Sequence, residues 1–268
     1  MTKILDGRAT RDAVLAQLTE KVRDLKPKPT LAIVLVGDDP ASQIYVREKE
    51  KAAKIIGVNF ELIKKTSSVS QRQLETLIEK LNRDQSVKGI VVQKPLPRQI
   101  DDDRVDLLIS PEKDVDGLNP ASELFPTTAR GVIKLLKEAG VKIAGKDAVV
   151  VGRSKLSGLP TALLLLKENA TVTICHSKTV GLKGKTTKAD ILVVAAGVPK
   201  LIGADMVKQG AVVVDVGTNR VPNTKKLVGD VDYENVKNVA AAISPVPGGV
   251  GPMIVAGLMM NLVEAASK

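Results

Sequence analysis

Three side chains that could move protons share the edge of one predicted helix. Ser42, Tyr45 and Lys49 are spaced i, i+3 and i+7 in a helix expected over 41–56. The same stripe continues into small and aliphatic residues, so Lys49 should lie where the helix meets the core. A partly desolvated ammonium releases its proton more readily and can serve in proton transfer. The structural alternative is that Tyr45 packs and Lys49 extends to solvent.

Further polar groups follow predicted strands. Gln93 ends a strand expected at 89–93, and ligands of parallel sheets bind at the carboxyl ends of strands. The loop segment 113–117, Lys-Asp-Val-Asp-Gly, carries two acids, one of which could hold an amino-heterocycle through paired N–H donors. A turn with solvated acids is the alternative for that loop.

Two glycine-rich segments could approach flat or phosphorylated ligands. The apolar segment 245–253 holds three prolines and three glycines, which fits a rigid loop against a planar ligand or a buried turn before the last helix. The segment 152–160 links a strand to a helix, as in dinucleotide-binding folds, but lacks the usual G-x-G-x-x-G spacing. The next strand ends near Ser177 without an acid. Together with Arg153, this pattern favours a 2′-phosphate and therefore NADP.

Short β-branched runs alternate with helical stripes, which predicts an α/β fold with parallel sheets in two lobes. In the first half, strands are expected at 31–36, 60–63 and 89–93, and helices at 41–56 and 71–82. In the second half, strands are expected at 148–151, 171–175, 191–195 and 212–216, and helices at 161–167 and about 253–266. The proline-rich loop 110–128 should be the domain junction.

Composition excludes several classes of protein. The chain has 268 residues and a net charge of +10, but its basic residues are dispersed and its four aromatic residues are too few to stack bases, so no nucleic-acid partner is expected. An anionic small molecule fits this charge better. Neither a membrane span nor a signal peptide is evident, and Cys175 is the only cysteine, which favours the cytoplasm. His176, the only histidine, is interpreted as a loop residue, and no metal site is expected.

Taken in order, these motifs resemble the bifunctional 5,10-methylenetetrahydrofolate dehydrogenase/5,10-methenyltetrahydrofolate cyclohydrolase family. Each motif alone is weak, whereas the ordered set spans nearly the whole chain. The matching segments are Ser42-x-x-Tyr45-Val46-x-x-Lys49, Val92-Gln93-x-Pro95-Leu96-Pro97, Lys113-Asp114-Val115-Asp116-Gly117, Val151-Gly152-Arg153-Ser154, Cys175-His176-Ser177-Lys178-Thr179, Asp215-Val216-Gly217, Gly229-Asp230-Val231 and Pro245-Val246-Pro247-Gly248-Gly249-Val250-Gly251-Pro252-Met253.

The resemblance implies hydride transfer from methylenetetrahydrofolate to NADP, then water addition and ring opening to 10-formyltetrahydrofolate. It implies that Lys49 is the main catalytic residue of the second step, with Tyr45, Gln93 and Ser42 beside it and Asp116 on the pterin. The remaining substrate-binding residues that it implies are Val92, Lys94, Pro247, Gly248, Gly249, Val250 and Gly251. The NADP-binding residues that it implies are Gly152, Arg153, Ser154, Ser177 and Thr218.

The resemblance also implies a domain plan and an assembly. Residues 1–122, completed by the terminal segment 250–268, would form an α/β catalytic domain that binds folate. Residues 123–249 would form a Rossmann-like, parallel-sheet domain that binds NADP. The family is typically a cytoplasmic homodimer in bacteria, joined through the cofactor lobes.

Some positions depart from the family pattern. Lys94 stands where the family usually has leucine; its ammonium would either repel Lys49 or point away and bind the glutamate tail of folate. Ile254 replaces a usual threonine, and the loop 119–126 is shorter than usual. These differences bear on the balance of the two activities.

The order of the motifs bears on other possible functions. A short-chain dehydrogenase shares the Tyr-x-x-x-Lys pair but places its glycine-rich turn before the tyrosine, whereas here the turn follows it. A shikimate-type dehydrogenase shares the lobe order but does not account for the segments 113–117 and 247–251. A non-catalytic NADP-binding paralogue remains as the non-enzyme alternative.

Overall fold

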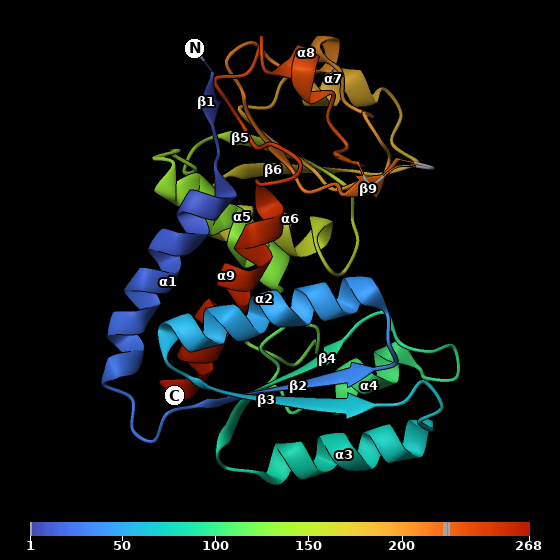
Figure 1. Ribbon diagram of the computed structural model, residues 1–268. Coiled ribbons are helices and arrows are strands. Elements are labelled where there is room, and N and C mark those ends of the chain that lie inside the picture. Colours follow the sequence, from blue (N-terminus) through green and yellow to red (C-terminus); the bar gives the residue numbers. More distant parts are fainter. Residues whose placement is uncertain (1, 222–223, 225) are drawn as a thin grey trace. The chain divides into compact units, whose positions relative to one another are not determined.

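The computed structural model describes residues 2–221, 224 and 226–268. The chain divides into two compact units (Figure 1). One unit, called the cofactor unit below, comprises Met1–Arg11 and Thr128–Ile254; the other, called the lysine unit, comprises Asp12–Thr127 and Val255–Lys268. Helices α1 (Gly7–Arg23) and α9 (Val250–Ala266) begin in the cofactor unit and end in the lysine unit.

The lysine unit is built on a three-stranded parallel sheet in the order β3-β2-β4. Its strands are β2 (Thr30–Val36), β3 (Asn59–Lys65) and β4 (Val87–Gln93). In Figure 1, helix α2 (Pro40–Ile56) covers one face of this sheet and α3 (Gln71–Arg83) covers the other. Since the strands are parallel, their carboxyl ends lie at one edge, which is where α2 begins and Gln93 is located.

Helix α2 has defined signals at both ends. The Asp39 carboxylate caps it by accepting a hydrogen bond from the Ser42 N–H at 2.7 Å, and Pro40 occupies the first turn, where its missing N–H costs nothing. Gly57 ends the helix in the left-handed region at φ 79°. The helix buries the predicted stripe against the sheet: Ser42, Val46, Lys49, Ala52, Ala53 and Ile56.

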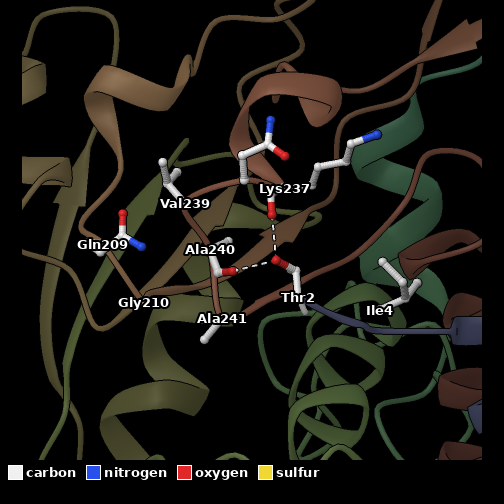
Figure 2. Close-up of a pocket in the computed structure, with 9 residues that line it drawn as sticks. Thr2, Ile4, Gln209, Gly210, Lys237, Val239, Ala240 and Ala241 are labelled. Atoms are coloured by element: carbon white, nitrogen blue, oxygen red, sulfur yellow. Dashed lines mark hydrogen bonds between the residues drawn. The ribbon is translucent and has the colours of Figure 1, made fainter.

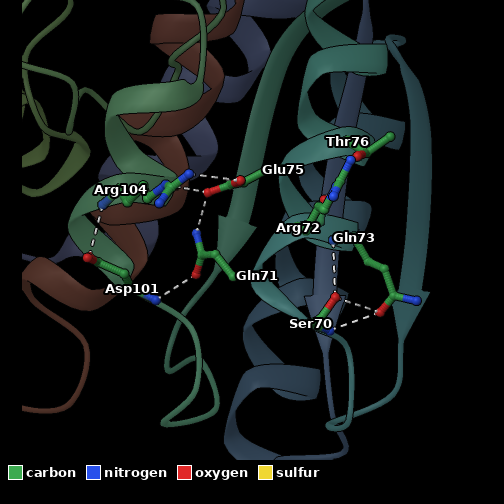
Figure 3. Close-up of polar contacts among 8 residues, drawn as sticks. All are labelled: Ser70, Gln71, Arg72, Gln73, Glu75, Thr76, Asp101 and Arg104. Atoms are coloured by element: carbon green, nitrogen blue, oxygen red, sulfur yellow. Dashed lines mark hydrogen bonds and ion pairs between the residues drawn. The ribbon is translucent and has the colours of Figure 1, made fainter.

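A short helix that was not predicted, α4 (Asp102–Leu108), is fastened to α3 by polar contacts (Figure 3). The Asp101 carboxylate caps α4, and the Asp101 N–H donates to Gln71 at 2.8 Å. The Arg104 guanidinium pairs with the Glu75 carboxylate at 2.5 Å. These contacts fix α4 beside the sheet edge.

The cofactor unit contains a six-stranded sheet in the order β1-β11-β8-β7-β5-β6, in which every pairing is parallel. Its strands are β1 (Lys3–Ile4), β5 (Asp147–Val151), β6 (Thr171–Cys175), β7 (Ile191–Val194), β8 (Val212–Asp215) and β11 (Ala242–Ile243). Its other elements are α5 (Thr127–Glu138), α6 (Gly158–Lys167), α7 (Leu182–Thr186), the 3₁₀ turn Ala204–Met206, α8 (Tyr233–Val236), and the antiparallel pair β9 (Asn219–Arg220) and β10 (Leu227–Val228). The predicted α/β class with a Rossmann-like parallel sheet is confirmed.

The N-terminal strand β1 joins the edge of this sheet. The Thr2 hydroxyl lies within hydrogen-bond distance of the Lys237 and Ala240 carbonyl oxygens, beside an open hollow of about 600 Å³ (Figure 2). The strand pairs with β11, a contact between segments more than 230 residues apart in the chain. Among the described residues, no helix is both long and apolar enough to cross a membrane.

The predicted start of two helices is wrong. Helix α6 begins at Gly158 rather than Thr161, and α9 begins at Val250 rather than Met253. In both, a proline that suggested a loop lies in the first turn, where the missing N–H has no helical partner to lose. Helices α1 and α5 were not predicted at all.

Candidate active site

A buried lysine in α2 meets the glutamine at the end of β4. Lys49 is 7% exposed, and its Nζ donates to Gln93 Oε1 at 3.0 Å. The helix supplies the lysine because the stripe that packs on the sheet passes through position 49. The parallel register brings the glutamine to the same edge. A partly desolvated amine held by a neutral acceptor is suited to proton transfer.

The main chain after Gln93 organises its neighbours. The Lys94 carbonyl oxygen accepts from Gln93 Nε2 at 2.7 Å and from the Ser42 hydroxyl at 3.3 Å. Ser42 is 2% exposed, so its hydroxyl is committed to this contact rather than to solvent. The structure therefore brings Ser42, Lys49, Gln93 and the Lys94 main chain together.

Tyr45 differs from Ser42 and Lys49 in its exposure. It is 51% exposed, whereas Ser42 and Lys49 on the same helix are buried. Its position at i+3 from Ser42 and i−4 from Lys49 places it at the solvent margin of the stripe. The expected shared face is therefore only partial: the tyrosine borders the site rather than packing in the core.

The Lys94 side chain has a partner that neither sequence alternative named. Its Nζ lies 2.7 Å from Asp106 Oδ2 and 3.7 Å from Asp102 Oδ2, both in α4. Asp106 is 4% exposed, so this is a largely buried ion pair. A carboxylate at this distance compensates the ammonium charge, which weakens any repulsion toward Lys49. Nothing in the sequence marked Asp106, because it lies among acids that resemble a solvated helix face.

The three charged residues of the loop 113–117 differ in their hydrogen-bond partners. Lys113 donates to the Leu81, Asn82 and Asp84 carbonyl oxygens. Burial lowers the pKa of the Lys113 ammonium.

Asp114 is also used inside the fold, whereas Asp116 is not. Asp114 is 1% exposed and accepts from the Gly117 and Asn119 N–H groups, and burial raises its pKa to about 6. Asp116 is half-buried and makes no side-chain hydrogen bond to the residues that the structure describes. Of the two acids, Asp116 is the one whose carboxylate can take an external donor.

A second hollow lies at the carboxyl end of the cofactor unit's sheet. It has a volume of about 450 Å³. Its lining includes the predicted cofactor residues Gly152, Arg153, Ser154 and Ser177. The fifth predicted residue, Thr218, is exposed and does not line it. His176 also lines it, and its Nδ1 accepts from the Lys178 N–H at 3.2 Å, in keeping with a positioned loop residue.

The turn between β5 and α6 can be made only with glycine. Gly152 has φ 125°, and a Cβ there would lie 2.1 Å from the Ala195 carbonyl oxygen. A Cβ at Gly158 would lie 2.3 Å from the Gly152 carbonyl oxygen. The Ser157 hydroxyl bonds to Ser154 at 2.8 Å instead of capping α6. At the start of α6 the Leu159 N–H already donates to the Ser154 carbonyl oxygen at 3.2 Å and Pro160 has no N–H, so it is the main chain of the glycine turn, rather than the helix end, that fits the phosphates of a dinucleotide.

Two buried aspartates shape the loops beside this hollow. Asp230 Oδ2 accepts from the N–H groups of Ala196 and Gly197. Asp215 accepts from the N–H groups of Gly217, Asp230 and Val231, and burial raises its pKa to about 7. Asp230 belongs to the matched segment Gly229-Asp230-Val231, but sequence reasoning gave it no role.

The segment 245–253 is a loop followed by the first turn of α9. Gly248 has φ 115°, its carbonyl oxygen accepts from the Gly7 N–H at 2.9 Å, and the bond before Pro247 is cis. Val250 and Gly251 are helical rather than part of a loop. All five predicted residues, Pro247 to Gly251, belong to the cofactor unit, so their assignment to the folate site remains a prediction.

Two family models match the chain. The one described as the catalytic domain of tetrahydrofolate dehydrogenase/cyclohydrolase matches residues 5–116, and the one described as its NAD(P)-binding domain matches residues 126–268. The Bifunctional protein FolD of Exiguobacterium sibiricum is 51% identical over 278 residues, covering 99% of this chain and 100% of the relative.

Solved structures agree with these matches. The bifunctional FolD methylenetetrahydrofolate dehydrogenase/cyclohydrolase of Campylobacter jejuni is 44% identical with a TM-score of 0.95, covering 100% of this chain and 99% of that one. The Trypanosoma brucei methylenetetrahydrofolate dehydrogenase-cyclohydrolase, solved with NADP and an inhibitor, is 39% identical with a TM-score of 0.92, covering 99% and 97%. Shikimate 5-dehydrogenase of Thermus thermophilus is 16% identical with a TM-score of 0.56, covering 88% and 98%, which shows a likeness of fold alone.

Proposed function

The chain belongs to the tetrahydrofolate dehydrogenase/cyclohydrolase family, and we propose that it oxidises 5,10-methylenetetrahydrofolate with NADP and hydrolyses the product to 10-formyltetrahydrofolate. The family predicted from the sequence motifs is confirmed, as is the bifunctional enzyme class. The relatives favour neither the shikimate-type nor the non-catalytic alternative. The observation that carries the proposal is the buried Lys49–Gln93 pair in a chain that matches the family over nearly its full length.

For the hydrolytic step we assign proton transfer to Lys49 Nζ. Water adds to the methenyl carbon, one carbon–nitrogen bond breaks, and one proton is released to solvent. The Gln93 amide accepts from the lysine at 3.0 Å, and the Lys94 carbonyl oxygen accepts from both that amide and the Ser42 hydroxyl. Tyr45, at the exposed margin, would cover the bound folate, and the Asp116 carboxylate would accept pterin N–H donors. Val92, the main chain of Lys94 and the residues Pro247 to Gly251 complete the proposed folate contacts.

For the oxidative step we assign NADP to the hollow beside α6. When bound there, NADP accepts the hydride released by the methylene carbon. The main chain of the turn that begins at Gly152 would hold the pyrophosphate, and Arg153, Ser154 and Ser177 would hold the 2′-phosphate. Thr218 would contribute from the next loop. This division assigns cofactor binding to residues 123–249 and folate chemistry to residues 1–122 and 250–268, except that the loop residues Pro247, Gly248 and Gly249 would contribute to the folate site.

The first experiment follows both activities in one time course. Purified protein is mixed with methylenetetrahydrofolate and either NADP or NAD, and reduced cofactor and methenyltetrahydrofolate are recorded together. Reduced NADP forming while methenyltetrahydrofolate stays low supports both activities. Accumulation of methenyltetrahydrofolate would refute the hydrolytic half, and no turnover with either cofactor would refute the proposal.

We also propose that the protein is a homodimer joined through the cofactor unit. Support comes from Leu159, Leu163 and Leu166, which are 41%, 49% and 58% exposed and form an i, i+4, i+7 stripe on α6. The neighbouring β6 is an edge strand with an exposed Ile174. A dimer that buries this stripe would remove it from water.

Sedimentation tests this assembly. Leu163→Lys should yield a monomer, whereas a lysine at the exposed Leu107 of the lysine unit should not change the oligomeric state. A monomeric wild-type protein would refute the assembly and leave the catalytic proposal intact. A cytoplasmic location is proposed as well, since the single cysteine, Cys175, is unpaired and buried.

A further inference from the structure

The orientation of the Gln93 amide is fixed at both ends. Its Nε2 donates to the Lys94 carbonyl oxygen at 2.7 Å, and its Oε1 accepts from Lys49 Nζ at 3.0 Å. A flipped amide would set oxygen against oxygen at one end and donor against donor at the other. The Lys94 carbonyl therefore decides which atom of Gln93 faces the catalytic lysine.

The side chain of the same residue, Lys94, is also held in place. The Lys94 ammonium is held at 2.7 Å by Asp106, whose side chain is 6% exposed, while the lysine side chain itself is 22% exposed. A charge-assisted hydrogen bond this short and this sheltered is much stronger than a surface ion pair. It fastens the residue that follows β4 to helix α4.

Helix α4 in turn is a fixed anchor. The Asp101 cap, the Gln71 contact and the Arg104–Glu75 ion pair join it to α3 (Figure 3). The α3 start is itself held by a capping box, in which Ser70 and Gln73 satisfy each other's backbone N–H groups. A continuous set of polar contacts thus runs from α3 through α4 and Lys94 to Gln93 and Lys49.

We propose that Lys94 is a positioning residue for the hydrolytic step: its ion pair with Asp106 holds the Lys94 carbonyl where it orients the Gln93 amide toward Lys49. This rests on the proposed function of Lys49. It gives Lys94 a role through the protein interior rather than through the glutamate tail of folate. Hydride transfer, which needs no proton at Lys49, should depend on Lys94 far less.

Lys94→Met tests the inference, because it keeps the length of the side chain and removes the ammonium. We expect kcat for methenyltetrahydrofolate hydrolysis to fall about tenfold, since misplacing a reacting group by about 1 Å can cost about 100-fold. KM should stay within about twofold, and hydride transfer within about threefold. Lys94→Arg, which can still pair with Asp106, should recover most of the loss.

Two controls separate positioning from general stability. Lys134→Met removes a lysine of similar side-chain exposure, 25%, that pairs with Glu138 at 2.6 Å in α5, and it should leave the ratio of the two activities unchanged. In a Gln93→Ala background, Lys94→Met should have no further effect on hydrolysis, because Lys94 acts through that amide. The Gln93 side-chain amide resonance, identified by its loss in Gln93→Ala, should shift in Lys94→Met without any assay of activity.

The outcomes distinguish this inference from the proposed function. The positioning role would be overturned if Lys94→Met lowered hydrolysis and hydride transfer equally. It would also be overturned if the effect of Lys94→Met were the same with and without Gln93, or if the amide resonance did not shift. If Lys94→Met does not fold, Asp106→Asn replaces it, with the same selective loss expected. Wild-type protein that turns over neither folate would instead overturn the proposed function, whereas normal hydrolysis by Lys94→Met would overturn only the inference.

Discussion

Replacement of Lys49 by methionine should separate the two activities. Methionine keeps the unbranched stem that packs in α2, so the change removes the ammonium while leaving little empty space. The lysine is 7% exposed and contacts Gln93 at 3.0 Å, so no solvent-exposed group on α2 can easily substitute for it. The expected result is a loss of hydrolysis with hydride transfer retained.

The size of the loss follows from the role assigned to the amine. General acid–base groups contribute about 100- to 10,000-fold, which corresponds to about 3–5 kcal/mol of transition-state free energy. Gln93 Oε1 also loses its donor, which costs about 1–3 kcal/mol of folding stability. The variant no longer has to bury an ammonium group, which offsets part of that loss of stability. The folded protein should therefore persist.

The assay records formation of reduced NADP from methylenetetrahydrofolate and, separately, disappearance of methenyltetrahydrofolate. Lys51→Met is the matched control on the same helix, since the Lys51 side chain is 68% exposed and pairs with Glu48 on the surface. Its hydrolysis rate should match the wild type. Hydrolysis by Lys49→Met within about twofold of wild type would refute the assignment of proton transfer to Lys49.

Three further changes test the cofactor unit. Arg153→Ala should raise the KM for NADP about tenfold, as expected for the loss of a partly exposed charge-assisted hydrogen bond. The KM for NAD should stay within about twofold of wild type. Equal effects on the two KM values would show that Arg153 does not contact the 2′-phosphate. Gly152→Ala should abolish NADP binding, measured by calorimetry, because its Cβ would lie 2.1 Å from the Ala195 oxygen, whereas Gly184→Ala, with open space around its Cβ, should bind normally. Burial raises the pKa of Asp215 to about 7, so the native state binds a proton that the unfolded state releases, and the free energy of unfolding should fall as pH rises from about 4 to about 7. Thermal unfolding midpoints across this range should show that fall, and Asp215→Asn should flatten it; an unchanged slope would refute this contribution.

The sequence predicted those parts of the fold that local patterns encode. The stripe from Ser42 to Ile56, the buried strand 31–36 and the glycine-rich turn at 152–160 were found because each follows from helix or strand periodicity or from glycine conformation. The starts of the helices at Gly158 and Val250 were predicted too late in the sequence. A proline usually indicates the end of a helix, but in these two helices it lies in the first turn, where it is tolerated. Helix α4 was missed because its seven residues, of which three are acidic, are too few to show a clear apolar stripe.

What the sequence determined by itself is which chemical groups are present and roughly where they lie. It set Lys49 at the apolar margin of a helix, Gln93 at the end of a strand and Gly152 after another strand, since these depend on neighbours a few residues away. The tertiary structure decided how those groups are used: Asp114 is committed to backbone donors while Asp116 is not, and Lys94 pairs with Asp106. Such outcomes depend on contacts between distant segments and on burial, which periodicity does not encode.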